Sequence, residues 1–533
     1  MDMALDQAPD IDSSPNTDAD LDSSTTSPDM FNTSPALVSL PVGQILGSVE
    51  DDIISFKGVP YAAPPTGALR FKAPVAPEPW TNIRDATSWP APCPQLDRTH
   101  GTPIGDEDCL HLNVWTPKGS SNAPVIVFIH GGGNMFGSTS EEGSGVFTYE
   151  GVRLARRSKA VVVTLQYRLN TLGYMSLEEL DNEAGHTSGN WGLRDQLFAL
   201  TWIQDHIHLF GGDPDRVMLF GESGGASSVC GLVATPEASG LFHAAIMQSG
   251  GCGGQILSDV RNWSSAIVEG VGCAQATDTL ACLRDVDAHE LARVSSEGGT
   301  TSEGIVLTLA GPMIDRVLLP QSPLLMMNEG LHNQVPLVFG VNADETASPL
   351  FGIIGRTWSQ TQYENYVRGI FGAQAESVLD VYSVGAGSEF RIPIQALIAL
   401  TTDLQFICPS RRYAQAASRG QQAPVYRFLF DHALSSTEAS LLGAFHGLEL
   451  MYNFQHLGEL EGYSASQDDL YVEEAMMSLW LDFAISNAPQ SFDGVQWQPY
   501  DEVTDPYLSI TSPLAMKQGL RTERCDFLES ISR

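Results

Sequence analysis

V-M-L-F-G-E-S-G-G-A-S-S fills residues 217 to 228 and joins a short apolar run to a glycine-rich turn. The apolar residues 217–220 predict a buried strand, and the small residues after the turn predict a helix. G-x-S-x-G between a strand and a helix is typical of a nucleophile elbow. Glycines at 221 and 225 let the strand and the helix approach closely. We therefore expect the Ser223 hydroxyl to project from the sheet edge, facing the positive end of the helix.

The composition limits the classes of protein to which the chain can belong. The chain has 533 residues, of which 43% are hydrophobic, so it can bury a sizeable core. It carries 64 acidic and 28 basic residues, for a formal net charge of −36. Nucleic acids and anionic membranes need a basic face, so neither is expected as a partner. No run approaches the about 18 apolar residues of a membrane-spanning helix, so no transmembrane segment is expected.

Residues 1–34 differ from the rest of the chain. They hold eight aspartates, many Ser, Thr and Pro residues, and no Lys or Arg. Such a composition cannot bury enough apolar area to offset chain entropy. We expect a disordered tail over 1–34 and a catalytic domain over 35–533. The sequence as given shows no signal-peptide pattern, and it stays open whether an export signal was removed or never existed.

Short apolar strands and helical stretches alternate along the rest of the chain. Apolar residues at three- and four-residue intervals predict an amphipathic helix over 193–210, which ends at a glycine before Pro214. Further strands are predicted at 125–129, 160–165, 244–247, 335–339 and 425–430. This alternation predicts a mostly parallel sheet with helices on both faces.

Six motifs stand in one collinear order along the chain. They are F-K-G-V-P-Y-A-A-P-P at 56–65, E-D-C-L-H-L-N-V-W at 107–115, H-G-G-G at 130–133, G-L-R-D-Q at 192–196, F-G-G-D-P at 210–214 and F-G-E-S-G-G at 220–225. With M-S-L-W-L-D-F-A near the end, they resemble the type-B carboxylesterase family, which includes carboxylesterases, cholinesterases and several fungal lipases. The resemblance runs from about Val42 to Phe527. It implies an α/β-hydrolase fold: a mostly parallel central sheet flanked by helices, with large insertions on one sheet edge.

A serine hydroxyl is a poor nucleophile at neutral pH and needs a base. In α/β-hydrolases the chain order is serine, acid, histidine, so the base is expected late in the chain. Among twelve histidines, His446 in G-A-F-H-G has room among small residues, and it matches the family's catalytic histidine. His432 and His456 are the nearest rivals and carry no motif. A core histidine bonded to backbone is the structural alternative.

The acid should follow a strand and precede the histidine. The strand predicted at 335–339 leads into G-V-N-A-D-E-T, where the family pattern has Asp-Glu-Gly with the glutamate in the triad. The resemblance therefore assigns Glu345, and Asp344 remains the alternative. Thr346 replaces the family's glycine. The acid would fix the imidazole tautomer and stabilise the imidazolium as it forms.

The H-G-G-G turn follows a predicted strand, where backbone N–H groups can face a developing oxyanion. Family correspondence selects the N–H groups of Gly132 and Gly133, with that of Gly224 after the nucleophile. The family often has alanine at position 224. Glu222 is a candidate for stabilising positive charge or positioning the deacylating water, and Ser249 resembles a family serine that hydrogen-bonds near the triad acid. A merely structural role stays open for both residues.

Eight cysteines occur, and sequence alone does not fix their pairing. The resemblance proposes Cys93–Cys109 and Cys273–Cys282. Disulfides imply an oxidising compartment, so a secreted, periplasmic or cell-surface location is expected. No C-x-x-C or H-x-x-x-H spacing supports a metal site, and neither a metal nor an organic cofactor is expected.

The other four cysteines are less defined. Cys408 and Cys525 match a long-range pair of cholinesterases, and whether they pair stays open. Cys230, in the helix predicted after the nucleophile, is expected to be a buried thiol. Cys252 is unassigned.

The loop between Cys93 and Cys109 bears on the substrate. In family lipases it is a long apolar lid, whereas here it is short and has only Leu96 and Ile104 as aliphatic residues. In cholinesterases it supplies a tryptophan for binding choline, and here it holds no aromatic residue. We expect a carboxylesterase that hydrolyses soluble or short-to-medium acyl esters through a Ser-His-Glu acyl-enzyme mechanism.

Two alternatives remain open from the sequence. One is a lipase or sterol-ester-type hydrolase of the same family. The other is a non-catalytic, cholinesterase-like adhesion protein, a class that lacks the nucleophile and against which the intact serine, acid and histidine argue.

Overall fold

The computed structural model describes residues 36–143, 146–297, 301–302, 305–306, 310–354, 357–435 and 442–531. The tail expected at 1–34 lies outside the described residues. None of the helices that the structure describes combines the length and apolar character needed to span a membrane.

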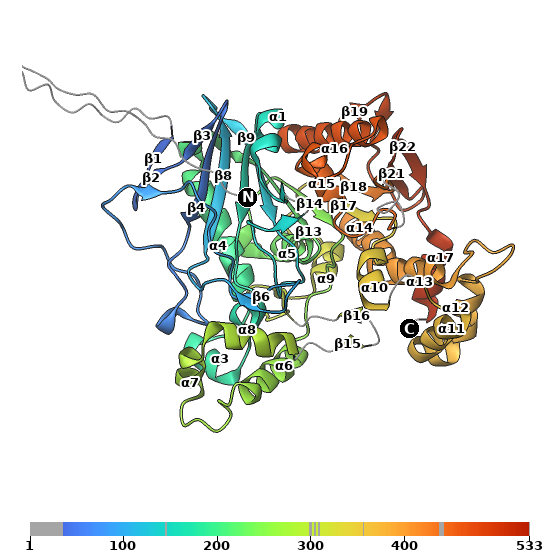
Figure 1. The fold of residues 1–533 in the computed structure, drawn as a ribbon, viewed down its shortest axis with the longest axis horizontal. Coiled ribbons are helices and arrows are strands. Elements are labelled where there is room, and N and C mark those ends of the chain that lie inside the picture. The colour runs from blue at the N-terminus through green and yellow to red at the C-terminus, as the bar shows by residue number, and fades with distance from the viewer. Residues whose placement is uncertain are drawn as a thin grey trace, which may run out of the picture. The chain divides into compact units, whose positions relative to one another are not determined.

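An eleven-stranded sheet organises the described part of the chain (Figure 1). Its strands lie in the order β22-β21-β18-β17-β14-β13-β9-β12-β8-β4-β3. From β12 to β21 every neighbouring pair is parallel, whereas the strands at the two ends pair antiparallel. The bounds are β3 Ser48–Glu50, β4 Ile53–Pro60, β8 His111–Pro117, β9 Ala123–Ile129, β12 Val161–Leu165, β13 Gly212–Glu222, β14 Ala244–Gln248, β17 Leu337–Asn342, β18 Val425–Phe430, β21 Pro506–Ile510 and β22 Ala515–Gln518. The mostly parallel sheet expected from the sequence is confirmed.

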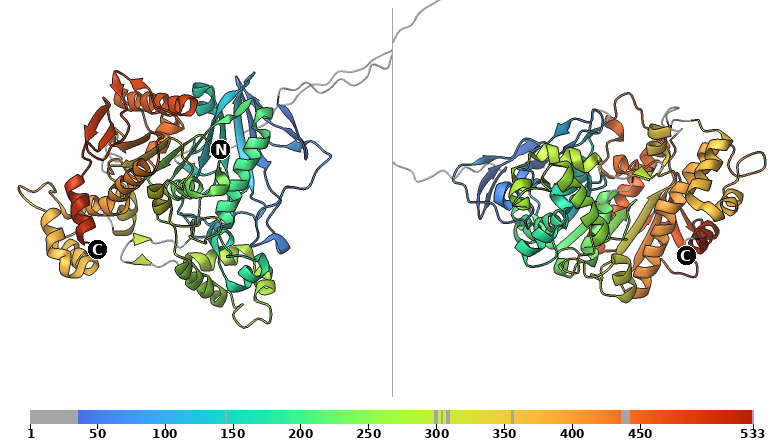
Figure 2. Two further views of the ribbon diagram at one scale, coloured as in Figure 1. Left: turned by 180° about the vertical axis from the view of Figure 1, so that it is seen from behind. Right: turned by 90° about the horizontal axis from the view of Figure 1, so that it is seen from below.

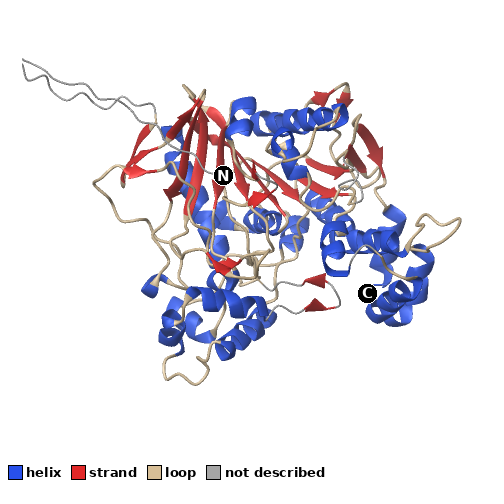
Figure 3. Ribbon diagram, in the orientation of Figure 1, coloured by secondary structure: helices blue, strands red, loops and turns tan. Residues whose placement is uncertain are grey.

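Alternate residues of β13 enter two different cores. Met218 and Phe220 belong to the core that contains residues of α1 and α16, whereas Val217 and Leu219 belong to the core built with α4, α5, α9 and α14. Successive side chains of a strand point to opposite faces, so a continuous apolar strand requires helices on both sides. Figure 3 shows helices flanking the strands, and the left view of Figure 2 shows the face that α4 covers. The helix bounds are α1 Val152–Ser158, α4 Trp191–His206, α5 Gly224–Ala234, α9 Pro323–Glu329, α14 Cys408–Gly420 and α16 Gln467–Ser486.

Two insertions leave the sheet at the carboxyl ends of its strands. The first follows β14 and contains α6 Leu257–Gly270, α7 Thr279–Asp285 and α8 Ala288–Glu297, which pack on α2 Asn170–Tyr174 and α3 Glu178–Ala184 in a core of their own. The second follows β17 and contains α10 Ala347–Ile354, α11 Gln360–Phe371, α12 Ala375–Val381 and α13 Pro393–Thr402. Both insertions therefore flank the sheet edge at which the serine turn lies.

Several sequence-based boundaries were wrong; the strand expected at 217–220, for example, spans Gly212–Glu222. The strand expected at 335–339 spans Leu337–Asn342, because Pro336 has no N–H to donate to a ladder. The helix expected over 193–210 ends as an α-helix at His206 and continues as a 3₁₀ turn, Ile207–Phe210.

The cysteine pairs Cys93–Cys109 and Cys273–Cys282 are bonded as expected, and the pair left open, Cys408–Cys525, is bonded as well.

The expectation of a free thiol in α5 was wrong. Cys230 is bonded to Cys252, with 5.5 Å between the Cα atoms. Because β13 and β14 are parallel neighbours, the segments that follow them leave the sheet side by side. A cysteine in each segment can therefore meet its partner, although nothing in their sequence spacing shows it.

Glycines allow the close approach of β13 and α5. A Cβ atom on Gly225 would lie 2.0 Å from the Ile129 carbonyl oxygen, and one on Gly221 would lie 2.6 Å from the Gly225 carbonyl carbon. No side chain fits at these distances. The turn that carries Ser223 therefore depends on both glycines.

Gly225→Ala is expected to lower the free energy of unfolding by about 1–3 kcal/mol, because the added methyl group collides with rigid backbone. Gly253→Ala is the matched control, since a Cβ atom there meets none of the described residues within 4 Å, and it should stay within about 0.5 kcal/mol of the parent. Urea unfolding measures both. Equal midpoints for the two variants would contradict the close approach.

Candidate active site

Ser223 stands between the end of β13 and the start of α5 in an unusual backbone conformation. Its φ is 55° and its ψ is −120°. A positive φ costs a non-glycine residue conformational free energy, so the conformation persists only where the surrounding structure enforces it. Here the Ser223 N–H donates to the Gln248 carbonyl (2.8 Å), and its own carbonyl accepts from the Ser227 N–H (3.0 Å). The turn therefore has the geometry expected of a nucleophile elbow.

His446 lies on the loop before α15, Glu449–Asn453, and its ring is fixed by the acid loop. Its Nδ1 is 2.6 Å from Oε2 of Glu345, which follows β17 and is fully buried. The other carboxylate oxygen of Glu345 accepts the N–H of Asn342 at 2.7 Å. With Nδ1 engaged, Nε2 is the nitrogen left for proton transfer.

The Nε2 atom of His446 faces the residue before the serine. It is 3.1 Å from Oε1 of Glu222, and within the described residues no hydrogen bond joins it to the Ser223 hydroxyl. In enzymes without substrate the catalytic hydrogen bonds are often long and tighten only in the complex. The structure thus brings the base and the acid into contact and leaves the serine–base contact unformed.

The other candidates for acid and base have separate roles. Asp344 accepts the Ala444 N–H (3.1 Å) rather than a ring nitrogen. His432 contacts Asp469, at 2.8 Å. The third candidate base, His456, contacts Glu459 at 3.0 Å.

Two of the candidate oxyanion donors lie next to each other. A Cβ atom on Gly224 would be 2.8 Å from the Gly133 nitrogen and 2.9 Å from the Asn134 nitrogen. Gly133 and Gly224 also line, with Ser223, a cavity of about 400 Å³. Gly132 is not among the residues that line it, although its positive φ (98°) shapes the same turn. An alanine at 224, frequent in the family, would require the H-G-G-G turn to move away.

The sequence profile of the carboxylesterase family matches residues 34–528. The chain belongs to this family. It is 34% identical to the para-nitrobenzyl esterase of Bacillus subtilis (strain 168), over 92% of this chain and 97% of that protein. It is 31% identical to the pyrethroid hydrolase Ces2e of Rattus norvegicus, over 91% of this chain and 88% of that protein. A solved PNB esterase structure superposes with a TM-score of 0.78 at 32% identity, covering 92% of this chain and 99% of its own. The chain is thus a carboxylic-ester hydrolase with the α/β-hydrolase fold.

Three buried carboxylates surround the imidazole of this family member. Burial raises the pKa of Glu222, and the attraction of His446 opposes that rise. Burial also raises the pKa of Glu449 to about 7, and the like charge of Glu345 adds to the rise. Burial by itself lowers the pKa of His446, but the charges of Glu222 and Glu345 outweigh it and raise that pKa to about 10. The charges of Glu222 and Glu345 therefore stabilise the imidazolium form of His446 against the effect of burial.

Sequence reasoning missed the polar groups behind the acid. Glu449 is fully buried and accepts from the side-chain amides of Asn342 (2.5 Å) and Gln248 (3.1 Å). Its spacing of three residues from His446 was the available signal, since such a spacing places two side chains close together where a helix begins. Gln248 carried no signal, because it reads as the end of a buried strand.

Ser249 and Phe406 form part of the cavity wall. The hydrogen bond expected of Ser249 near the triad acid is not formed: its hydroxyl is buried and has no partner among the described residues, and the residue lines the cavity at Ser223. The Phe406 ring lies 5.2 Å from the His446 ring. Phe406 comes from a π-helical turn, Asp403–Ile407, a geometry frequent at functional sites. No sequence pattern indicates such a turn.

Glu222→Gln is expected to shift the acid limb of the pH profile of kcat/KM to lower pH by about one unit. The negative charge of Glu222 stabilises the imidazolium and so raises the pKa of His446; its removal lowers that pKa, and the neutral base becomes available at lower pH. In the variant, the pKa of His446 is expected to lie between the ordinary histidine pKa of about 6.5 and the raised value of about 10. Exposed Glu237→Gln should leave the limb in place. A limb that stays fixed or moves up in Glu222→Gln contradicts this electrostatic role.

Proposed function

We propose that Ser223, His446 and Glu345 form the catalytic triad of a general carboxylesterase. The observation that carries the proposal is the contact of His446 Nδ1 with the buried carboxylate of Glu345 at 2.6 Å, beside a serine in the elbow conformation. Nucleophile, base and orienting acid thus occur in the order and on the elements that α/β-hydrolase chemistry requires.

The proposed reaction is acyl transfer in two steps. A rotation of the serine side chain brings Oγ to Nε2 of His446, which accepts the proton while Oγ attacks the ester carbonyl carbon. The N–H groups of Gly132, Gly133 and Gly224 stabilise the oxyanion, and His446 then protonates the departing alcohol. Water, activated by the same histidine, attacks the acyl-enzyme and releases the acid.

The carboxylates around His446 have a proposed electrostatic role. Glu345 keeps the ring in the tautomer that presents Nε2, and Glu222 stabilises the imidazolium formed when Ser223 loses its proton. Both are buried, so their charges act with little screening by water. The raised pKa of His446 supports this role.

The substrates proposed are soluble or short-to-medium acyl esters. The described lining of the cavity at Ser223 includes the polar side chains of Asn134, Ser227, Ser249 and Gln405, with Phe406 as its one aromatic residue. Such a wall suits compact esters better than long hydrocarbon chains. The relatives support a broad substrate range, since their names include a para-nitrobenzyl esterase, a pyrethroid hydrolase and, in Mus musculus, an acylcarnitine hydrolase.

We also propose that the protein matures outside the reducing cytosol, in a secreted, periplasmic or cell-surface location. All eight cysteines are paired in four disulfides. Disulfides persist in oxidising environments and are rare where thiols are kept reduced.

Ser223→Ala is expected to lower kcat for p-nitrophenyl butyrate by about 10⁴- to 10⁶-fold, because the attacking oxygen is removed. Ser227→Ala is the matched control: its hydroxyl lines the same cavity, one helical turn on, and has no proposed role in the chemistry. Steady-state kinetics on both variants measures the two losses and tests the assignment of Ser223 as the nucleophile. Retention of activity by Ser223→Ala would refute the nucleophile assignment.

Glu345→Gln and Asp344→Asn separate the two neighbouring acids. Glu345→Gln should lower kcat by about 10³- to 10⁴-fold, because a neutral amide neither fixes the tautomer nor stabilises the imidazolium. Asp344→Asn should stay within about tenfold of the parent, since Asp344 contacts Ala444 and not the ring. The reverse order of losses, measured in the same assay, would transfer the triad role to Asp344.

A further inference from the structure

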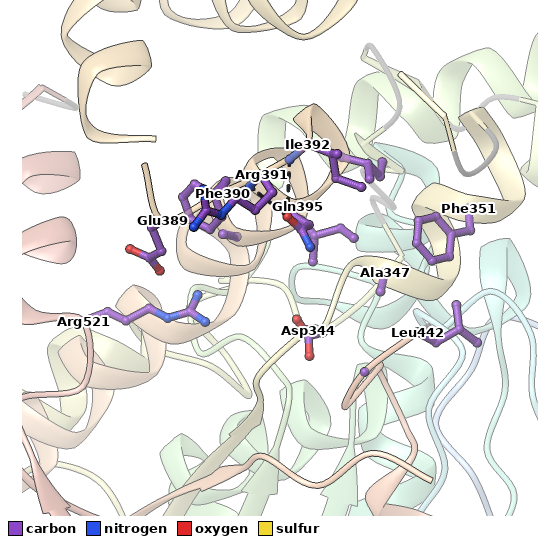
Figure 4. Close-up of a pocket in the computed structure, with 14 residues that line it drawn as sticks. Asp344, Ala347, Phe351, Glu389, Phe390, Arg391, Ile392, Gln395, Leu442 and Arg521 are labelled. Atoms are coloured by element: carbon purple, nitrogen blue, oxygen red, sulfur yellow. Dashed lines mark hydrogen bonds between the residues drawn. The ribbon is translucent and has the colours of Figure 1, made fainter. Parts of the chain in front are cut away.

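A second cavity, of about 690 Å³, lies behind the acid loop (Figure 4). Its walls come from α10, α13, the segment 389–392, the segment 442–443 and Arg521. Among the residues that the structure describes, none lines both this cavity and the cavity at Ser223. Its volume is in the range of small-molecule binding sites. The cavity is therefore large enough to be a site in its own right.

One part of the lining is hydrocarbon and aromatic. Figure 4 shows Phe351 and Leu442 on one side of the cavity, opposite Glu389 and Arg521. The apolar lining residues are Ala347, Phe351, Phe390, Ile392, Ile394, Ile398, Ala399 and Leu442. Such a wall favours an alkyl chain, because each buried methylene group contributes about 0.8 kcal/mol.

Of the four charged residues that line the cavity, two are ion-paired, Asp344 accepts a backbone N–H, and Arg391 is the fourth. Arg521 donates to Asp403 at 2.6 Å, and Glu389 is ion-paired with Arg524. The exposed Arg391 contributes its backbone N–H to Gln395 (3.0 Å), but its guanidinium makes no hydrogen bond or ion pair within the described residues. An arginine that lacks a partner beside an apolar cavity is suited to bind a carboxylate, which it can hold through two hydrogen bonds.

The floor of the cavity joins the two proposed catalytic loops. Asp344 precedes Glu345, and it pairs twice with Ala444, two residues before His446. Its N–H donates to the Ala444 carbonyl (3.0 Å), and its carboxylate accepts the Ala444 N–H (3.1 Å). Gly443 has a φ of 63°, which favours glycine, and a Cβ atom there would lie 2.1 Å from that carboxylate and displace it. A ligand in the cavity would thus contact Asp344, whose two hydrogen bonds with Ala444 join the loop of the acid to the loop of the base.

We propose that this cavity binds a medium-chain aliphatic carboxylate, with its chain against Phe351, Ile398 and Leu442 and its head group on Arg391. The compound is of the class of acids that ester hydrolysis releases, and this link to catalysis rests on the proposed function. Binding itself does not depend on turnover.

The probe is decanoate below its micelle concentration, titrated calorimetrically into the full chain. Saturable binding to one site is expected. Leu442→Trp, which fills the cavity, should abolish it, and Arg391→Gln should weaken it about tenfold by removing the charge. Gly251→Trp is the matched control, because it fills the cavity at Ser223, and binding should persist. Ile398→Trp replaces Leu442→Trp if the latter fails to fold by circular dichroism.

Three results would overturn the proposal: no saturable binding, loss of binding in Gly251→Trp with retention in Leu442→Trp, or equal affinity in Arg391→Gln and the parent. Decanol tests the head group, since it should bind more weakly than decanoate and should not respond to Arg391→Gln. Hydrolysis retained by Ser223→Ala would refute the proposed function and leave the binding result standing, so the two failures are distinguishable.

Discussion

The backbone at Ser223 is the constraint on which the rest of the structure depends. A serine with φ of 55° is held there only because β13 is fixed between β9 and β14 and because glycines let α5 start directly above the sheet. The H-G-G-G turn comes from the end of β9, and Gln248, whose carbonyl accepts the Ser223 N–H, ends β14. The parallel sheet thus delivers three separate parts of the site to one edge.

Electrostatics explains how an acidic protein can use a histidine base. Glu222, Glu345 and Glu449 are buried near one imidazole, and each would be costly there without a partner. The side-chain amides of Asn342 and Gln248 satisfy Glu449, whereas His446 contacts both of the others. Amides and imidazole together compensate the charge, so the cluster stabilises a positive ring at the moment it forms.

The sequence predicted the central features because they are local. The strand Val425–Phe430 was exact, and the serine turn, the family and the pairing of His446 with Glu345 followed from motifs. The Cys230–Cys252 bond depends instead on which strands are neighbours in the sheet. The orientation of Nε2 toward Glu222 depends on side-chain packing, which a pattern in the linear sequence does not predict. The cavity behind Asp344 arises where the second insertion, the segment after β18 and the C-terminal segment meet, and no single stretch encodes it.

The bond between Cys230 and Cys252 has a consequence for how substrate range can diverge. The segment Gly250–Gly254 has four glycines around Cys252, so its backbone would be flexible without a cross-link. It forms one wall of the cavity at Ser223. Cross-linking to α5 makes that wall a rigid reference surface beside the nucleophile. Adaptation to new esters is therefore expected in the rest of the lining, such as the π-helical turn that carries Gln405 and Phe406.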